Sequence, residues 1–170
     1  MKKLVPLALF VVASLAAPAA EIPASVDRAE IPNYQKLAPG LAVAGQPAPD
    51  ALKTLGALGF KTVVSLRTPA EGFGKDQAVV EEQRLRWVSV PVSPGTFSKQ
   101  DVEAVAKVLD DPKAGPVLLY CGSSNRVGGV LAVYQATKGK SHDEALAEGK
   151  KAGLKSPQMI EAVEKVLRTP

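Results

Sequence analysis

Short apolar segments with strand character alternate with amphipathic segments along most of this chain. Residues 41–44, 61–66, 87–90 and 116–121 are rich in β-branched or other apolar side chains, as buried strands are. The segments between and after them repeat apolar residues at the spacing of a helical face. This alternation predicts an α/β fold with a central, mostly parallel sheet flanked by helices.

Start and stop signals locate the helices. Ser98 with Asp101, and Ser141 with Glu144, have the spacing of capping boxes. The expected helices cover residues 49–59, 75–86, 98–109, 127–134, 141–153 and 156–167. The helix over residues 75–86 is so rich in charge that we interpret it as a solvated face.

Composition limits the functional classes. The chain of 170 residues is 46% apolar and 22% charged, which suits one folded domain, expected over residues 34–170. A single cysteine and a single histidine exclude a disulfide framework and a His-rich metal site. We therefore expect neither a metal nor another cofactor.

The N-terminus has the features of a secretory signal peptide. Lys2 and Lys3 precede an apolar run over residues 4–17, shorter than the roughly 20 residues of a membrane-spanning helix. We expect residues 1–19 to be removed, residues 20–33 to form a linker or extended arm, and the product to be periplasmic or secreted in a bacterium. An uncleaved anchor is the alternative; after cleavage we expect no stable membrane insertion. The remaining 19 basic and 17 acidic residues do not indicate nucleic-acid binding.

One segment, residues 121–126, has the features of an anion site; we call it the phosphate loop. It consists of Cys121, Gly122, Ser123, Ser124, Asn125 and Arg126. It lies between an expected strand and an expected helix, so small residues there can present backbone amides next to a helix N-terminus. Arg126 adds a planar fork suited to two oxygens of an oxyanion. The same surroundings favour the thiolate of Cys121, whereas an isolated cysteine at this place would be an ordinary buried residue.

With these residues, the chain resembles the cysteine-dependent phosphatases, and most closely the beta-lactamase-hydrolase-like phosphatase domains of the dual-specificity-like group. The resemblance covers about residues 34–155. It is carried by the segments 45–47, 59–67 with Glu71, 88–91, 121–126 and 139–154. It implies that Cys121 is the nucleophile, forming a phosphocysteine, and that Arg126 binds a phosphate-bearing substrate.

Four departures from the family pattern affect the chemistry. Tyr120 replaces a common histidine, Ser124 replaces a usual glycine, and Val127 replaces the hydroxyl residue that helps expel the thiolate. The loop over residues 92–98 also lacks the Asp that usually serves as general acid. Asp101 is the nearest candidate, although capping the following helix is the simpler role.

Two alternatives remain open: a phosphate-binding domain without activity, and a rhodanese-like sulfurtransferase, which also uses a Cys-x4-Arg loop. The sulfurtransferases continue into a further strand, which this sequence does not predict after residue 127. Arg67 and Glu71 follow an expected strand and either pair with each other or border the pocket.

Overall fold

A computed structural model describes residues 21–169, so the expected signal peptide lies outside the described part of the chain. Five strands form one sheet in the order β1-β2-β5-β3-β4. Their bounds are β1 Gln35–Ala38, β2 Leu41–Ala44, β3 Thr62–Ser65, β4 Arg86–Ser89 and β5 Val117–Tyr120. Only the β1–β2 pair is antiparallel, so the predicted mostly parallel sheet is confirmed.

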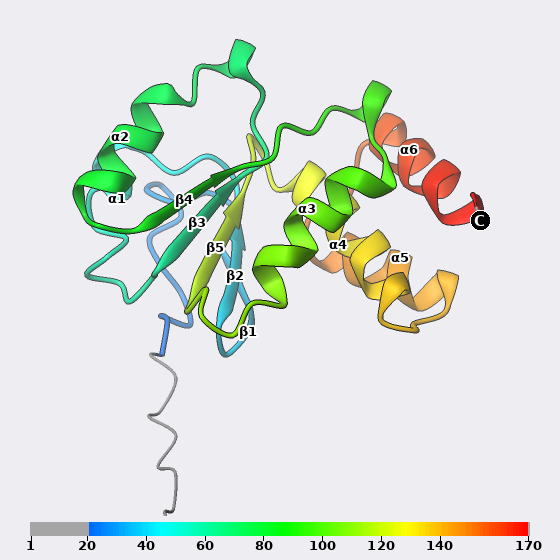
Figure 1. Cartoon of the computed structure of the whole chain (residues 1–170), viewed down its shortest axis with the longest axis horizontal. Helices are drawn as coiled ribbons and strands as arrows, with labels where there is room; N and C mark the ends of the chain where they lie inside the picture. The colour runs from blue at the N-terminus through cyan, green and yellow to red at the C-terminus, as the bar shows by residue number, and fades with distance from the viewer. Residues whose placement is uncertain (1–20, 170) are drawn as a thin grey trace, which may run out of the picture.

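Helices cover both faces of this sheet (Figure 1). On one face lie α1 (Pro49–Leu52) and α2 (Gly74–Glu82). On the other lie α3 (Lys99–Leu109) and α4 (Asn125–Thr137), and α4 is in turn packed against α5 (His142–Lys151) and α6 (Pro157–Arg168). Two short 3-10 helices, η1 (Pro69–Glu71) and η2 (Pro94–Thr96), follow β3 and β4. No helix among residues 21–169 is both long and apolar enough to cross a membrane.

The sheet separates two hydrophobic clusters, and alternation along β5 assigns its side chains to them. Leu118 and Tyr120 belong to the cluster beneath α1 and α2. Leu119 belongs to the cluster beneath α3 and α4, and so does Cys121, the first residue after the strand. The strand therefore directs the cysteine toward the start of α4.

Two helices are shorter than the sequence predicts. The helix expected to reach Gly59 ends at Leu52, after which the amides of Lys53 and Thr54 donate to carbonyls only three residues back. The helix expected to reach residue 86 ends at Glu82, because Arg84 has φ +60°, a left-handed conformation that stops a helix. Both capping boxes are present where predicted.

The segment 21–33, expected to be a linker or arm, contacts the domain. Ile22 and Ile31 are each 1% exposed within the cluster beneath α1. The Tyr34 hydroxyl donates to the Pro23 carbonyl at 2.7 Å. These contacts connect the start of the described chain to the sheet.

Candidate active site

The phosphate loop lies at the carboxyl edge of the sheet, where β3, β4 and β5 end side by side (Figure 1). It is bordered by the end of β2, because the Gln46 amide donates to the Gly122 carbonyl at 3.2 Å. Gly45 and Ser123 form an isolated antiparallel β-bridge. A Cβ at Gly45 would lie 3.2 Å from the Gly122 carbonyl oxygen, so a residue without a side chain fits this approach best.

The amides of residues 122–127 are the feature that suits an anion. Within the described chain, none of them donates a hydrogen bond to a protein acceptor. Three belong to the loop before α4 and three to the first turn of this helix, whose N-terminus carries partial positive charge. Backbone donors that lack a protein acceptor, at a helix N-terminus and next to a thiol in the sequence, suit the binding of an anion.

Side chains of the loop hold its shape. Ser124 has φ +66°, a left-handed conformation that glycine adopts more easily, and its hydroxyl donates to the Ala152 carbonyl at 2.9 Å. Asn125 holds the chain before α6: its Oδ1 accepts from the amides of Lys155 and Ser156, and its Nδ2 donates to the Ser156 hydroxyl at 2.8 Å. Both side chains are thus engaged with the segment joining α5 to α6.

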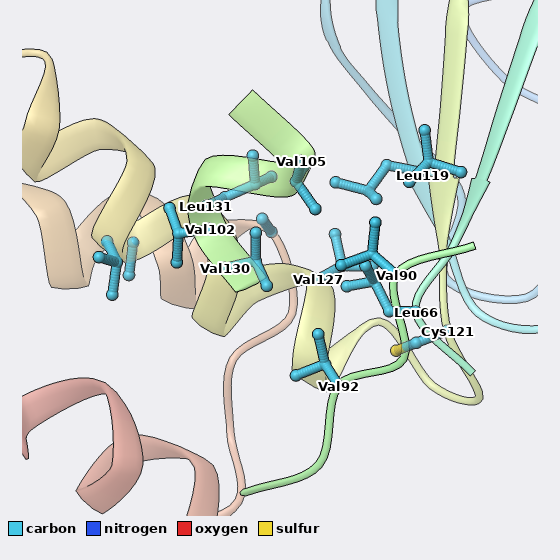
Figure 2. Close-up of a cluster of buried hydrophobic side chains, with 14 of the residues drawn as sticks. Leu66, Val90, Val92, Val102, Val105, Leu119, Cys121, Val127, Val130 and Leu131 are labelled. Carbon is cyan, nitrogen blue, oxygen red and sulfur yellow. The ribbon is translucent and has the colours of Figure 1, made fainter. Parts of the chain in front are cut away.

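Cys121 is fully buried in the apolar cluster beneath α4. Figure 2 shows its sulfur at the edge of this cluster, with Val92 and Val127 on the same side. The thiol is therefore screened from water in this structure. Its position at the start of the loop nevertheless places it next to the free amides.

Arg126 is turned toward the protein and is held by Glu71. The two side chains form a two-pronged ion pair, with Nη1 2.7 Å from Oε2 and Nη2 2.6 Å from Oε1. Nη1 also donates to the carbonyls of Leu66 and Val92, each at 3.1 Å. The hydrogen bonds from Arg126 lower the pKa of Glu71 to about 2. In return, Glu71 and, to a smaller extent, the Cys121 sulfur raise the pKa of Arg126.

Arg67 does not pair with the Glu71 carboxylate. It donates to the Glu71 main-chain carbonyl and forms an ion pair with Asp76 at 2.8 Å. The same Asp76 oxygen accepts from the Tyr120 hydroxyl at 2.9 Å and from Gln46 Nε2 at 3.0 Å. Burial raises the pKa of Tyr120, which keeps this donor protonated.

Asp76 is the residue of this region that sequence reasoning missed. Its side chain is only 13% exposed, so the interpretation of its helix as a solvated face is wrong at this position. A charged residue at the N-terminus of a polar helix gives no signal of burial. Only the fold, which brings the ends of β2, β3 and β5 together, shows its contacts.

Asp101, the candidate general acid of the sequence, is engaged as a helix cap. Its carboxylate accepts from the amide and the hydroxyl of Ser98, at 2.9 and 3.0 Å, as the cap of α3.

An open cavity of about 500 Å³ lies between η2 and α6, and Glu161 is the one carboxylate among its lining residues. In residues 21–169, no group of three or more His, Cys, Asp or Glu is arranged to hold a metal ion.

Comparison with known proteins identifies the family. The family model described as "Beta-lactamase hydrolase-like protein, phosphatase-like domain" matches residues 33–138. A beta-lactamase hydrolase-like protein of Xylella fastidiosa strain 9a5c is 26% identical over 137 residues, covering 76% of this chain and 32% of the relative. The homologue from strain Temecula1 is 27% identical over 120 residues, which are 67% of this chain and 28% of the relative. The chain thus spans about a third of the length of the curated relatives it matches.

Solved structures share the fold. TpbA of P. aeruginosa is 25% identical, with 89% of this chain and 91% of that chain covered and a TM-score of 0.66. A cysteine-to-serine form of TpbA, 24% identical with a TM-score of 0.66 and coverage of 89% and 90%, was solved with phosphotyrosine. Tk-PTP in its active form is 20% identical, with 82% and 99% covered and a TM-score of 0.67. From α4 onward the described chain continues into α5 and α6 without another strand, unlike the layout expected of the sulfurtransferases.

Proposed function

Because this chain belongs to the phosphatase-like domain family of beta-lactamase hydrolase-like proteins, we propose that it hydrolyses phosphate monoesters by way of a phosphocysteine. The observation that carries the proposal is the set of six free amides beside Cys121, together with Arg126 against the same loop. An oxyanion bound there would satisfy these donors and face the sulfur.

In the proposed reaction, the amides of residues 122–126 and the guanidinium of Arg126 bind three phosphate oxygens. The Cys121 thiolate attacks phosphorus, the S–P bond forms, and the P–O bond to the leaving group breaks with both electrons on oxygen. Water then attacks the phosphocysteine, and the S–P bond breaks to return the thiolate and release inorganic phosphate. The donors stabilise the additional charge on the phosphoryl oxygens in both steps.

The proposed substrate is an aryl phosphate such as phosphotyrosine, which TpbA binds in its cysteine-to-serine form. We also propose that the protein acts outside the cytoplasm, on the basis of the signal-peptide features of residues 1–19. Outside the cytoplasm, cytosolic phosphoproteins and ATP are out of reach. The substrates of an exported phosphatase would be exported phosphoproteins or small phosphate esters.

A second candidate, a phosphate-binding domain without turnover, is favoured by two observations. Cys121 is fully buried, so a phosphoryl group has to displace neighbouring side chains to reach the sulfur. The carboxylate of Asp101 is engaged as a helix cap and does not lie ready to protonate a leaving group. Such a domain would keep the amides and Arg126 as a binding site only.

Hydrolysis of p-nitrophenyl phosphate by the parent and by Cys121→Ser separates the two functions. The phosphatase releases nitrophenol and the variant does not, while both bind inorganic phosphate in calorimetry. Rapid acid quenching of the parent with ³²P-labelled substrate should also trap labelled protein, which the variant would not yield. Equal inertness of the two proteins with phosphate binding intact would rule out the enzyme and leave the binding domain.

A further inference from the structure

The guanidinium of Arg126 has two usable edges, and Glu71 occupies only one of them. Nη1 is surrounded by three acceptors, the carboxylate of Glu71 and the carbonyls of Leu66 and Val92. Nη2 gives one hydrogen to Glu71. The Nε hydrogen and the second hydrogen of Nη2 have no oxygen acceptor in the described chain, so no oxygen of the protein occupies the edge formed by Nε and Nη2.

The Nη2 end of this edge lies against the phosphate loop. A Cβ built on Gly122 would be 3.5 Å from Nη2 and 3.8 Å from Oε1 of Glu71, so both charged groups lie directly against the loop backbone. The Cys121 sulfur contributes to the raised pKa of Arg126. With only 15% of its side chain exposed, Arg126 has few alternative orientations.

Glu71 is itself fixed from two directions. Its Oε2 accepts from the amide and the hydroxyl of Thr68, at 2.9 and 3.0 Å, as the capping box of η1. Its main-chain carbonyl accepts from Arg67, which is anchored to Asp76. The carboxylate is therefore held before any ligand arrives.

We propose that Glu71 is a positioning residue that holds the Nη1–Nη2 edge of Arg126 so that the Nε–Nη2 edge is oriented to bind an oxyanion in the phosphate loop. The inference rests on the proposed function, because it assigns the oxyanion to that loop. In this arrangement Glu71 contacts Arg126 and not the oxyanion. The negative charge of its carboxylate is neutralised by the Nη1–Nη2 edge of Arg126. Placing the guanidinium before binding removes the cost of ordering a long side chain when the ligand enters.

The test is anion binding, which needs no turnover. Calorimetry with inorganic phosphate and with vanadate compares the parent, Glu71→Gln and the control Glu164→Gln. Glu164 also pairs with an arginine, Arg168, on α6, and it forms a hydrogen bond with His142 of α5. We expect Glu71→Gln to weaken both anions by about tenfold or more, by analogy with other losses of positioning, and Glu164→Gln to leave them unchanged. Unchanged or tighter binding in Glu71→Gln overturns the proposal, since the carboxylate would then be a bystander or a competitor.

A second measurement starts from the variant Arg126→Ala and asks whether Glu71 can hold a guanidinium that is not part of the chain. Removing the side chain in Arg126→Ala leaves Glu71 facing an empty place, where added guanidinium ion is expected to bind and restore part of the phosphate affinity. In Arg126→Ala/Glu71→Gln this rescue should disappear, whereas a merely structural role of Glu71 would leave it intact. If the parent binds phosphate but does not hydrolyse p-nitrophenyl phosphate, the proposed enzyme fails while the positioning role is still decided by these titrations.

Discussion

At the scale of single residues, the two carboxylates that the sequence offers to the site, Glu71 and Asp101, are engaged with other groups. Glu71 is paired with Arg126 and Asp101 caps α3. The segment from Val92 to Ser98 contains no Asp or Glu. For the proposed phosphatase, we therefore expect that no carboxylate of this segment protonates the leaving group and that the acidity of the leaving group sets the rate.

Gly95→Asp tests this dependence on the leaving group. Gly95 lies in η2 and a Cβ there meets no atom within 4 Å, so the side chain is accommodated. The parent should hydrolyse p-nitrophenyl phosphate much faster than phenyl phosphate, whose leaving group is less acidic. We expect Gly95→Asp to raise the phenyl phosphate rate by about tenfold or more, because a positioned proton donor typically contributes 10²–10⁴. Steady-state assays with Gly95→Asn and Glu161→Gln are the controls. Equal rates of the parent on both substrates would contradict the idea that no side chain protonates the leaving group. A loss of activity in Glu161→Gln would contradict it too.

The ion pair of Glu71 predicts the direction of a pH dependence. The pKa of Glu71 is about 2 in the folded protein, below the 4.5 of an unperturbed group. Its stabilising effect is therefore fully present above pH 4.5 and is lost as the pH falls toward 2. Thermal melting of the parent and Glu71→Gln should show a difference in Tm at neutral pH that disappears near the acid end of this window. A difference that stays constant with pH would show that the pair contributes nothing to folding.

The sequence was sufficient to predict Cys121 and Arg126 as site candidates, since both belong to one short motif. It was not sufficient for the partner of Arg126. Glu71 lies 55 residues earlier in the chain, and which of two nearby basic residues it meets depends on where β3 ends relative to β5. The contacts of Asp76 likewise join three separate strand ends, and no local pattern encodes them.

At the scale of elements, the phosphate loop is held by the close packing of α4 and α5. Gly128 lies in the first turns of α4, and a Cβ there would be 2.2 Å from the Leu154 amide nitrogen and 2.4 Å from the Gly149 carbonyl oxygen. These are backbone atoms, which cannot rotate away as a flexible side chain would. The glycine therefore allows α4 to approach the end of α5, which in turn brings Ala152 to the Ser124 hydroxyl.

Gly128→Ala is expected to destabilise the domain by about 3 kcal/mol, the upper range for an overpacked core. Gly74→Ala is the matched control, because it also replaces a helical glycine, at the start of α2, where a Cβ meets nothing within 4 Å. Urea unfolding followed by circular dichroism measures both. If the two variants unfold at the same urea concentration, α5 is free to move away from α4 and the proposed constraint does not exist.

The elements themselves show what local signals can and cannot predict. The capping boxes of Ser98 and Ser141 mark the starts of α3 and α5 correctly because a helix start depends on neighbouring residues. The sequence extends α1 too far, since leucines that continue a helical spacing also pack well from successive turns. It extends α2 too far because the left-handed Arg84 ends this helix early. Leu55 is fully buried although it lies beyond the end of α1.

At the scale of the whole molecule, the segment 21–33 packs against the domain. Ile22 and Ile31 pack with Phe60 and Leu118 beneath α1, on the face of the sheet opposite to Cys121. The Gly45 amide donates to the Pro32 carbonyl at 2.7 Å. The next residue, Gln46, donates its amide to the Gly122 carbonyl of the phosphate loop. The described N-terminal segment thus supports the β2 end of the site.

The variant Ile31→Ala tests whether the segment 21–33 supports the β2 end of the site. Removing a buried isoleucine side chain typically costs about 2–5 kcal/mol, and Ile31 is 1% exposed, so we expect a loss in this range. Leu37→Ala is the control, because Leu37 on β1 is 40% exposed and its truncation should cost well under half as much. Because the Pro32 carbonyl holds Gly45 beside Ser123, we further expect Ile31→Ala to weaken phosphate binding in calorimetry, while Leu37→Ala leaves it unchanged. A stability loss without any change in phosphate affinity would show that the segment buries apolar surface but does not shape the loop.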